Sequence, residues 1–345
     1  GGATNPFISL YLVQVALGAV FLSGVLFIIL TILPVREWVI NAIPRSLKMA
    51  ISAGIGLFLG IIALKNAGIV VAHPATLVTL GALTAPSVIL AVCGFIVMVA
   101  LDAKRVPGAI IIAILATTMA GILLGVSEFK GIASLPPDPS PTFLQLDIAG
   151  ALQVGLLAVV FAFFFVDLFD TAGTLVGVAH RAGLLDAEGR LPRLKRALMA
   201  DSVATVAGSA LGTSTTTSYI ESAAGIKAGG RTGLTAVVVA VLFLACLFLS
   251  PLAGTVPAYA TAPALLFVAC LMTRGLAELD WEDVTEYVPG VVAALSMPLT
   301  FSIAHGIAFG FITYAAIKLL SGRAGEASPV VYVLAVLFVV KFIVI

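Results

Sequence analysis

Three aspartates of this chain lie in apolar stretches, where a carboxylate is costly to bury. Asp167, Asp170 and Thr174 are spaced i, i+3 and i+7, so a helix places them on one face. A carboxylate at the bilayer centre costs roughly 2.5–3.5 kcal/mol on insertion scales. We therefore interpret Asp170 as part of a ligand or proton site and Asp167 as its support, with hydrogen bonding between helices as the structural alternative. Asp201, near the start of the next apolar stretch, is expected to act as a support or a helix cap.

Six consecutive hydroxyl residues, 213–218, interrupt a further apolar stretch and are followed by Glu221. Such side chains disfavour a helix, and non-helical backbone at membrane depth is tolerated only where it is buried in protein or lines a cavity. We predict a short extended segment followed by a half-helix that starts near Tyr219. Glu221 then lies in its first turn, near free backbone amides that can bind an anion or a polar heterocycle. An ordinary polar loop with a capping glutamate is the alternative.

A planar base suits these groups, because its ring edge alternates hydrogen-bond donors and acceptors. Carboxylates accept from ring N–H and amino groups, and backbone groups supply the complement. Buried polar groups that are left unpaired are costly, so such a site discriminates strongly between substrates. A carboxylate with little water around it can also exchange a proton. Movement of the substrate can thereby be coupled to a proton gradient.

The composition indicates which elements must position these residues. Hydrophobic residues make up 61% of the 345 residues and charged residues 10%, whereas soluble domains are about 45–50% apolar and about 25% charged. The chain is therefore predicted to be an all-α polytopic membrane protein whose solvent is the lipid bilayer. The net charge of +1 gives no reason to expect a nucleic-acid partner. The three cysteines lie in apolar runs without metal or redox spacing, so no metal and no cofactor are expected.

Apolar runs of about 20 residues are long enough to span a bilayer. We predict spans near residues 10–33, 44–64, 84–101, 107–125, 151–178, 197–212, 232–253, 259–275, 286–302, 304–320 and 329–345. The basic residues cluster in the loops between them, which places those loops in the cytoplasm, whereas the proline-rich loop 126–147 is expected outside. Similar helix–link–helix segments carry Ile43-Pro44 and Val256-Pro257 on opposite sides of the membrane. They indicate an inverted repeat, although prolines that simply start helices are an alternative.

Two long motifs resemble a known family. Residues 164–174 (FFVDLFDTAGT) and 212–226 (GTSTTTSYIESAAGI) resemble the AzgA-like purine permeases of the nucleobase/ascorbate transporter superfamily. The similarity extends over nearly the whole chain. It implies two inverted seven-span repeats, a core domain and a gate domain, with short strands in two broken spans beside the substrate. It also implies uptake of adenine, guanine or hypoxanthine with a proton as the coupling ion, across the plasma (inner) membrane, and dimerisation through the gate domain.

The resemblance also implies roles for individual residues. By position, Asp170 and Glu221 match the two substrate-binding acids of the family, and the backbone near Ile220 would contact the base. Thr174 falls where related uracil carriers place a polar proton-coupling residue, so it is expected near the substrate. The remaining residues, expected to support the site or proton coupling, are Asp167, Asp201, Thr217 and Ser218.

The same resemblance divides the chain into segments. They are residues 1–33 (the remainder of the first-repeat core), 34–125 (gate domain, first part), 126–147 (external loop), 148–253 (core domain, second repeat), 254–320 (gate domain, second part) and 321–345 (an additional C-terminal helix). The first repeat of the family normally begins with two further spans and a third that contributes to the site. Residues 1–9 do not supply these, so we expect the N-terminal spans to be missing from this sequence.

Three other functions are compatible with acidic residues in membrane spans. An intramembrane aspartyl protease needs two aspartates that face each other, whereas Asp167 and Asp170 lie on one helix without a Gly-x-Gly-Asp motif, so an enzyme is not expected. An anion carrier or channel of the same architecture is disfavoured by acids at the site. A uracil or xanthine carrier of the same fold stays open, although the Asp-Thr-Ala-Gly-Thr form favours the purine branch.

Overall fold

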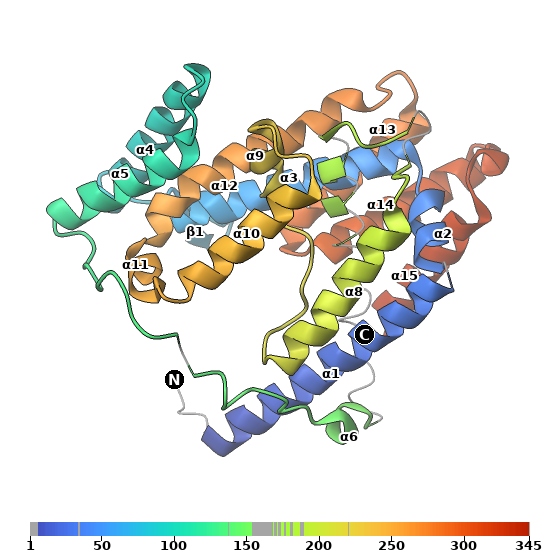
Figure 1. Ribbon diagram of the computed structural model, residues 1–345. Coiled ribbons are helices and arrows are strands. Elements are labelled where there is room, and N and C mark those ends of the chain that lie inside the picture. Colours follow the sequence, from blue (N-terminus) through green and yellow to red (C-terminus); the bar gives the residue numbers. More distant parts are fainter. Residues whose placement is uncertain are drawn as a thin grey trace. The chain divides into compact units, whose positions relative to one another are not determined.

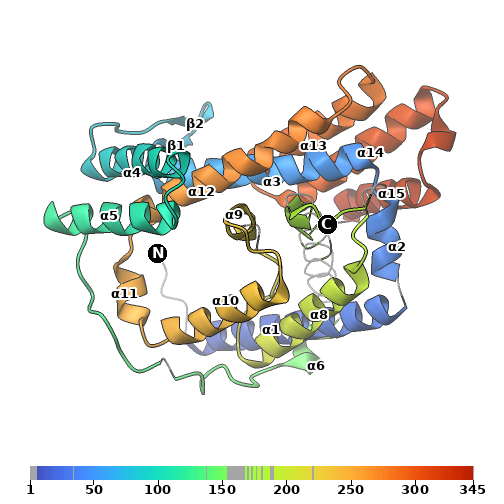
Figure 2. The same cartoon turned by 45° about the horizontal axis from the view of Figure 1, so that its top comes forward.

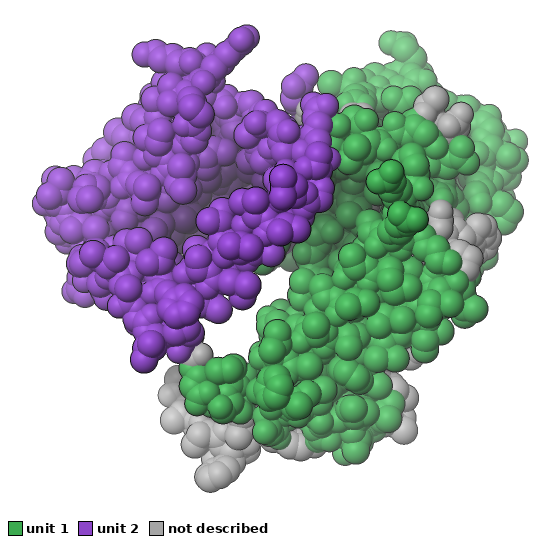
Figure 3. Space-filling view, viewed as in Figure 1, with its two compact units in different colours: residues 1–52, 138–220, 275–345 green, residues 53–137, 221–274 purple. Residues whose placement is uncertain are grey.

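The computed structural model describes the chain except residues 1–5, 34, 137, 154–167, 169–170, 172–173, 176, 180–181, 187–189, 220 and 345, and it leaves out the side chains of 6–12, 35–38 and 344. The chain forms two compact units (Figure 3). Unit 1 comprises residues 1–52, 138–220 and 275–345, and unit 2 comprises residues 53–137 and 221–274. Each unit is therefore built from segments that are far apart in the sequence. The core and gate boundaries given above stay a prediction.

Unit 1 is built from helices. They are α1 (Pro6–Ile32), α2 (Val35–Ala42), the first turns of α3 (Arg45–Asn66), α6 (Ile148–Ala151), α8 (Leu194–Ala210), most of the 3-10 turn η1 (Arg274–Glu278), α13 (Val284–Thr300), α14 (Ile303–Leu320), the 3-10 turn η2 (Ala324–Glu326) and α15 (Pro329–Val344). α1 carries no charged residue along its 27 residues, and a helix satisfies its backbone internally in lipid. α1 runs alongside α8, and α13 packs against α14 (Figures 1 and 2).

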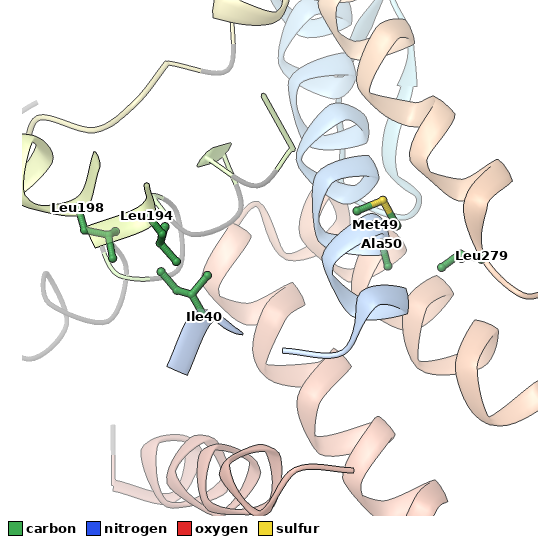
Figure 4. Packing of buried hydrophobic residues seen from close by; sticks show 6 residues of the cluster. All are labelled: Ile40, Met49, Ala50, Leu194, Leu198 and Leu279. Atoms are coloured by element: carbon green, nitrogen blue, oxygen red, sulfur yellow. The ribbon is translucent and has the colours of Figure 1, made fainter. Parts of the chain in front are cut away.

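Small residues allow these helices to approach closely. On α14, a Cβ at Gly306 would overlap Met297, and one at Gly310 would lie 2.7 Å from the Cβ of Ala293. This small-xxx-small spacing is typical of helix pairs in membranes. The cluster drawn in Figure 4 shows apolar packing at other contacts of the unit. There Ile40 of α2 faces Leu194 of α8.

A buried lysine links α13, α14 and η2. The Lys318 side chain is 0% exposed, and its Nζ lies 2.7 Å from Glu286 Oε1 and 2.8 Å from Glu326 Oε2. The Lys318 ammonium also donates to Thr285 Oγ1 at 2.9 Å. Glu286 accepts a further hydrogen bond from the Tyr314 hydroxyl at 3.1 Å. The ammonium is thus surrounded by acceptors, as a buried charge requires.

Arg323 extends this cluster at the helix ends. Its guanidinium pairs with Asp283 at 2.8 Å and with Glu326 at 2.8 Å. Hydrogen bonds from Arg323 and Thr285 hold the pKa of the Asp283 carboxyl well below its usual range. Hydrogen bonds from Arg323 and Lys318 lower the pKa of Glu326 to about 2. Both carboxylates are therefore charged at neutral pH and tie the ends of α13 and α14 to η2.

Unit 2 combines helices with one hairpin. Its elements are the rest of α3, β1 (Val70–His73), β2 (Leu77–Leu80), α4 (Pro86–Ala103), α5 (Ala109–Leu123), α9 (Ser222–Lys227), α10 (Gly233–Cys246), α11 (Ser250–Thr255) and α12 (Ala258–Thr273). β1 and β2 are antiparallel, with Val70 opposite Leu80 and His73 opposite Leu77. α12 packs against α4 and α5 (Figure 2), and Met98, Ala113 and Phe267 form the core between them.

The structure confirms the helical membrane fold that the sequence predicts. Among the described residues, five helices are long and apolar enough to cross a membrane: Val13–Ile32, Arg45–Asn66, Pro86–Ala103, Ala258–Glu278 and Ile303–Leu320. Helices also occur at the other described spans, with two differences. The span predicted at 232–253 is divided into α10 and α11, and the link after α3 contains the β1–β2 hairpin. Most of the span predicted at 151–178 lies outside the described residues.

Candidate functional site

The predicted site residues divide into those that the structure describes and those that it does not. Asp167, Asp170 and Ile220 lie outside the described residues. The described residues expected at the site are Thr174, Asp201, Thr217, Ser218 and Glu221. The structure brings Asp201 and Thr217 together in unit 1, through a residue that the sequence analysis did not single out.

That residue is Thr171, which is fully buried and directly follows Asp170 in the sequence. Its Oγ1 lies 3.2 and 3.3 Å from the two carboxylate oxygens of Asp201 and donates to them. The same Oγ1 lies 2.9 Å from Thr217 Oγ1. A threonine hydroxyl has one proton to donate and can accept as well. One buried hydroxyl thus joins an acidic residue of α8 to the hydroxyl-rich segment.

α8 presents a polar face to that segment. Asp201, Thr205 and Gly208 are spaced i, i+4 and i+7, so they lie on one side of the helix. Asp201 is 7% exposed and Thr205 is 0% exposed. Thr205 Oγ1 donates to the carbonyl of Thr216 at 3.0 Å and accepts from the Thr216 amide at 3.3 Å. The Thr205 side chain therefore supplies hydrogen-bond partners to the Thr216 backbone. Among the described residues, no neighbouring strand supplies them.

Glycines at the end of α8 let the chain turn back along it. Gly212 has a φ of +89°, a conformation that glycine adopts without strain. The Thr213 amide bonds to the carbonyl of Gly208 at 2.9 Å. A Cβ at Gly208 would lie 2.8 Å from Thr216 Oγ1, so any larger residue there would force the Thr216 side chain to move. Residues 213–217 accordingly run back past Gly208 and Thr205 towards Asp201.

Thr174 was expected near the substrate, and the structure places it in the same buried region. It is 4% exposed, and its hydroxyl donates to the carbonyl of Thr171 at 3.2 Å. Back-bonding of this kind satisfies a hydroxyl within its own helix. Its proposed role in proton coupling stays a prediction.

Glu221 is the N-cap residue of α9 in unit 2. The half-helix predicted to start near Tyr219 thus starts at Ser222, because residues 213–219 have no regular secondary structure. The Glu221 side chain makes no capping hydrogen bond to the amides of α9. Its expected role in substrate binding stays a prediction.

The other end of α9 is anchored by charge. Lys227, its last residue, forms an ion pair with Asp102 at the end of α4. Its Nζ also lies 4.6 Å from the ring centroid of Phe267 on α12, within reach of a cation–π contact. The short helix that follows Glu221 is thus fixed to two longer helices of unit 2.

Comparisons with known proteins identify the family of the chain. A model of a permease family matches residues 7–340. The chain is 55% identical over 331 residues to a putative permease of Methanocaldococcus jannaschii, covering 96% of this chain and 76% of that protein. It is 48% identical over 330 residues to the adenine permease AdeP of Escherichia coli, covering 96% and 74%. It is 45% identical over 332 residues to the guanine/hypoxanthine permease PbuO of Bacillus subtilis, covering 94% and 77%.

The fold also occurs among solved structures. The transmembrane domain of the cyanobacterial bicarbonate transporter BicA matches with a TM-score of 0.56 and 18% identity, over 86% of this chain and 76% of that one. SLC26A9 matches with a TM-score of 0.52 and 14% identity, over 89% and 50%. These likenesses show a shared fold, and the sequence relatives show the family. The chain is a multi-pass membrane protein that belongs to the permease family.

Proposed function

We propose that this protein carries purine nucleobases, namely adenine, guanine or hypoxanthine, across the membrane. The observation that carries the proposal is the 48% identity to an adenine permease over 96% of the chain. A guanine/hypoxanthine permease at 45% identity supports the same class of substrate. The likeness to a bicarbonate transporter is one of fold alone, at 18% identity, so it gives no support to an anion carrier.

In the proposed mechanism, Asp170 and Glu221 accept hydrogen bonds from the base, and the backbone near Ile220 contacts it. The base leaves chemically unchanged, so the protein acts as a carrier and not as an enzyme. Proton symport by alternating access is the proposed mode of coupling, because carboxylates at a site with little water can take up and release a proton. A homodimer formed through the gate domain belongs to the same proposal.

Uptake assays test the site. Wild type and the variants Asp170→Asn and Glu221→Gln are produced in cells that lack purine carriers of their own, and uptake of radiolabelled adenine, guanine and hypoxanthine is measured. Wild-type uptake should exceed the empty-vector background, and both variants should lose it while staying in the membrane. Glu128→Gln, which alters an exposed loop carboxylate, is the matched control and should transport normally. Normal uptake by both site variants would contradict the assignment of the two acids.

Proton coupling needs its own measurement. Purified protein is placed in vesicles that contain a pH-sensitive dye, and purine is added outside. Symport predicts acidification of the lumen that depends on purine, together with loss of accumulation when a protonophore is present. Accumulation that persists with the protonophore, without any change in luminal pH, would exclude proton symport and leave the substrate assignment standing.

A further inference from the structure

Thr171 belongs to a helical stretch that is described at residues 171, 174–175 and 177–179, called the Thr171 helix below. Among the described residues of this helix, Thr171 is the one whose side chain hydrogen-bonds both to α8 and to the hydroxyl-rich segment. Thr171 is fully buried, so water does not compete with Asp201 and Thr217 for its hydroxyl. We propose that Thr171 is a positioning residue for substrate binding, which holds segment 213–219 against the Thr171 helix and α8. The proposal rests on the proposed function, because it concerns the same site.

The direction of the hydrogen bonds follows from their chemistry. The carboxylate of Asp201 can only accept, so the single proton of the Thr171 hydroxyl is directed to it. Thr217 must then donate to the Thr171 oxygen. The chain of bonds therefore runs from Thr217 through Thr171 to the charge of Asp201. Hydrogen bonds to a charged group are stronger than neutral ones, so the Asp201 charge strengthens the hold on Thr217.

The position of Thr217 explains why this hold matters for the substrate. Thr217 is four residues before Glu221, and Thr171 directly follows Asp170. The second attachment of the segment, between Thr205 and the Thr216 backbone, fixes its distance from α8 but involves no described residue of the Thr171 helix. Thr171 alone among the described residues connects that helix to the segment. Removing the Thr171 hydroxyl should make segment 213–219, which leads to Glu221, less firmly held. Both proposed substrate ligands, Asp170 and Glu221, stay in place in the sequence.

Thr171→Val tests the idea, because valine keeps the shape of threonine and loses the hydroxyl. We expect the KM for purine uptake to rise at least about tenfold, the loss expected for a buried hydrogen bond to a charged group. Protein abundance in the membrane should be unchanged. Thr171→Ser, which keeps a hydroxyl at this position, should have a KM close to that of wild type. Thr118→Val is the matched control, since the buried Thr118 hydroxyl donates to the carbonyl of Ile114 in its own helix; its KM should not change.

A second readout does not depend on transport. In a background without the native cysteines, Thr215→Cys places a thiol on the half-buried segment, and its rate of labelling by a maleimide reports how firmly the segment is held. Thr171→Val should raise that rate at least severalfold, and Thr171→Ser should not. An unchanged KM and labelling rate in Thr171→Val would overturn the proposal, as would a serine variant that behaves like valine. If the wild-type chain takes up no purine, the proposed function fails, and the labelling rates alone then decide whether Thr171 positions the segment.

Discussion

Replacing the buried Lys318 by methionine should destabilise unit 1 measurably. The substitution removes the ammonium that pairs with Glu286 at 2.7 Å and Glu326 at 2.8 Å, and it leaves the Glu286 carboxylate to weaker hydroxyl donors. Breaking a buried ion pair by removing one partner costs about 3–5 kcal/mol. The two glutamate side chains are 22% and 48% exposed, so water compensates in part and the lower end, about 3 kcal/mol, is expected. At the average unfolding entropy per residue, this corresponds to a fall of about 4 °C in the unfolding midpoint.

Thermal unfolding of the purified protein in one detergent, at one scan rate, measures this change. Lys104→Met is the matched control, because Lys104 is exposed at the end of α4, and its midpoint should stay near that of wild type. The double variant Lys318→Met, Glu286→Gln should lose less than the sum of the two single changes, because the second change removes the carboxylate that the first left unpaired. A Lys318→Met midpoint equal to wild type, or simple additivity in the double variant, would refute the reasoning.

Three further outcomes are expected. Because the folded-state pKa of Glu326 is lowered from 4.5 to about 2, its stabilisation is complete above pH 4.5 and is lost as the pH falls towards 2; Arg323→Gln should flatten that part of a plot of unfolding midpoint against pH. Gly56→Val should lower the folded yield in a size-exclusion profile, since even a Cβ there would lie 2.7 Å from a side chain of α12. Reversing either charge of the pair between Lys227 and Asp102 should reduce purine uptake by about fivefold or less, the size of a partly exposed ion pair, and reversing both should restore it.

The spans could be predicted because length and hydropathy decide them in lipid. A run such as α1, which has no charge in 27 residues, has few alternatives to a helix. α2 was missed because its eight residues are too short to span and include two charges. The β1–β2 hairpin was missed because strands of four residues leave little periodicity to detect, and most of their side chains are exposed.

Candidate site residues could be predicted from the sequence where burying their side chains in a membrane costs free energy. Asp201 could be selected because a buried carboxylate is expensive wherever it lies in the membrane, and the structure shows it 7% exposed. Thr171 and Thr205 could not be selected by the same reasoning. A threonine in an apolar helix can donate to its own backbone at little cost, as Thr118 does, and the sequence does not distinguish that arrangement from a bond to another segment.

The hydroxyl-rich run and the polar face of α8 are best understood as one feature. Residues 213–217, if extended, cover roughly 13 Å, and the helix from Gly208 back to Asp201 covers roughly 10 Å, so the two lengths nearly match. A segment without helical hydrogen bonds needs partners for its backbone, and Thr205 supplies them to Thr216. The spacing of the polar and small residues on α8 therefore explains why residues 213–217 can be non-helical. The composition of the segment shows only that a helix is disfavoured there. A substitution on this face of α8 should thus act on the segment before Glu221 even where it contacts no substrate.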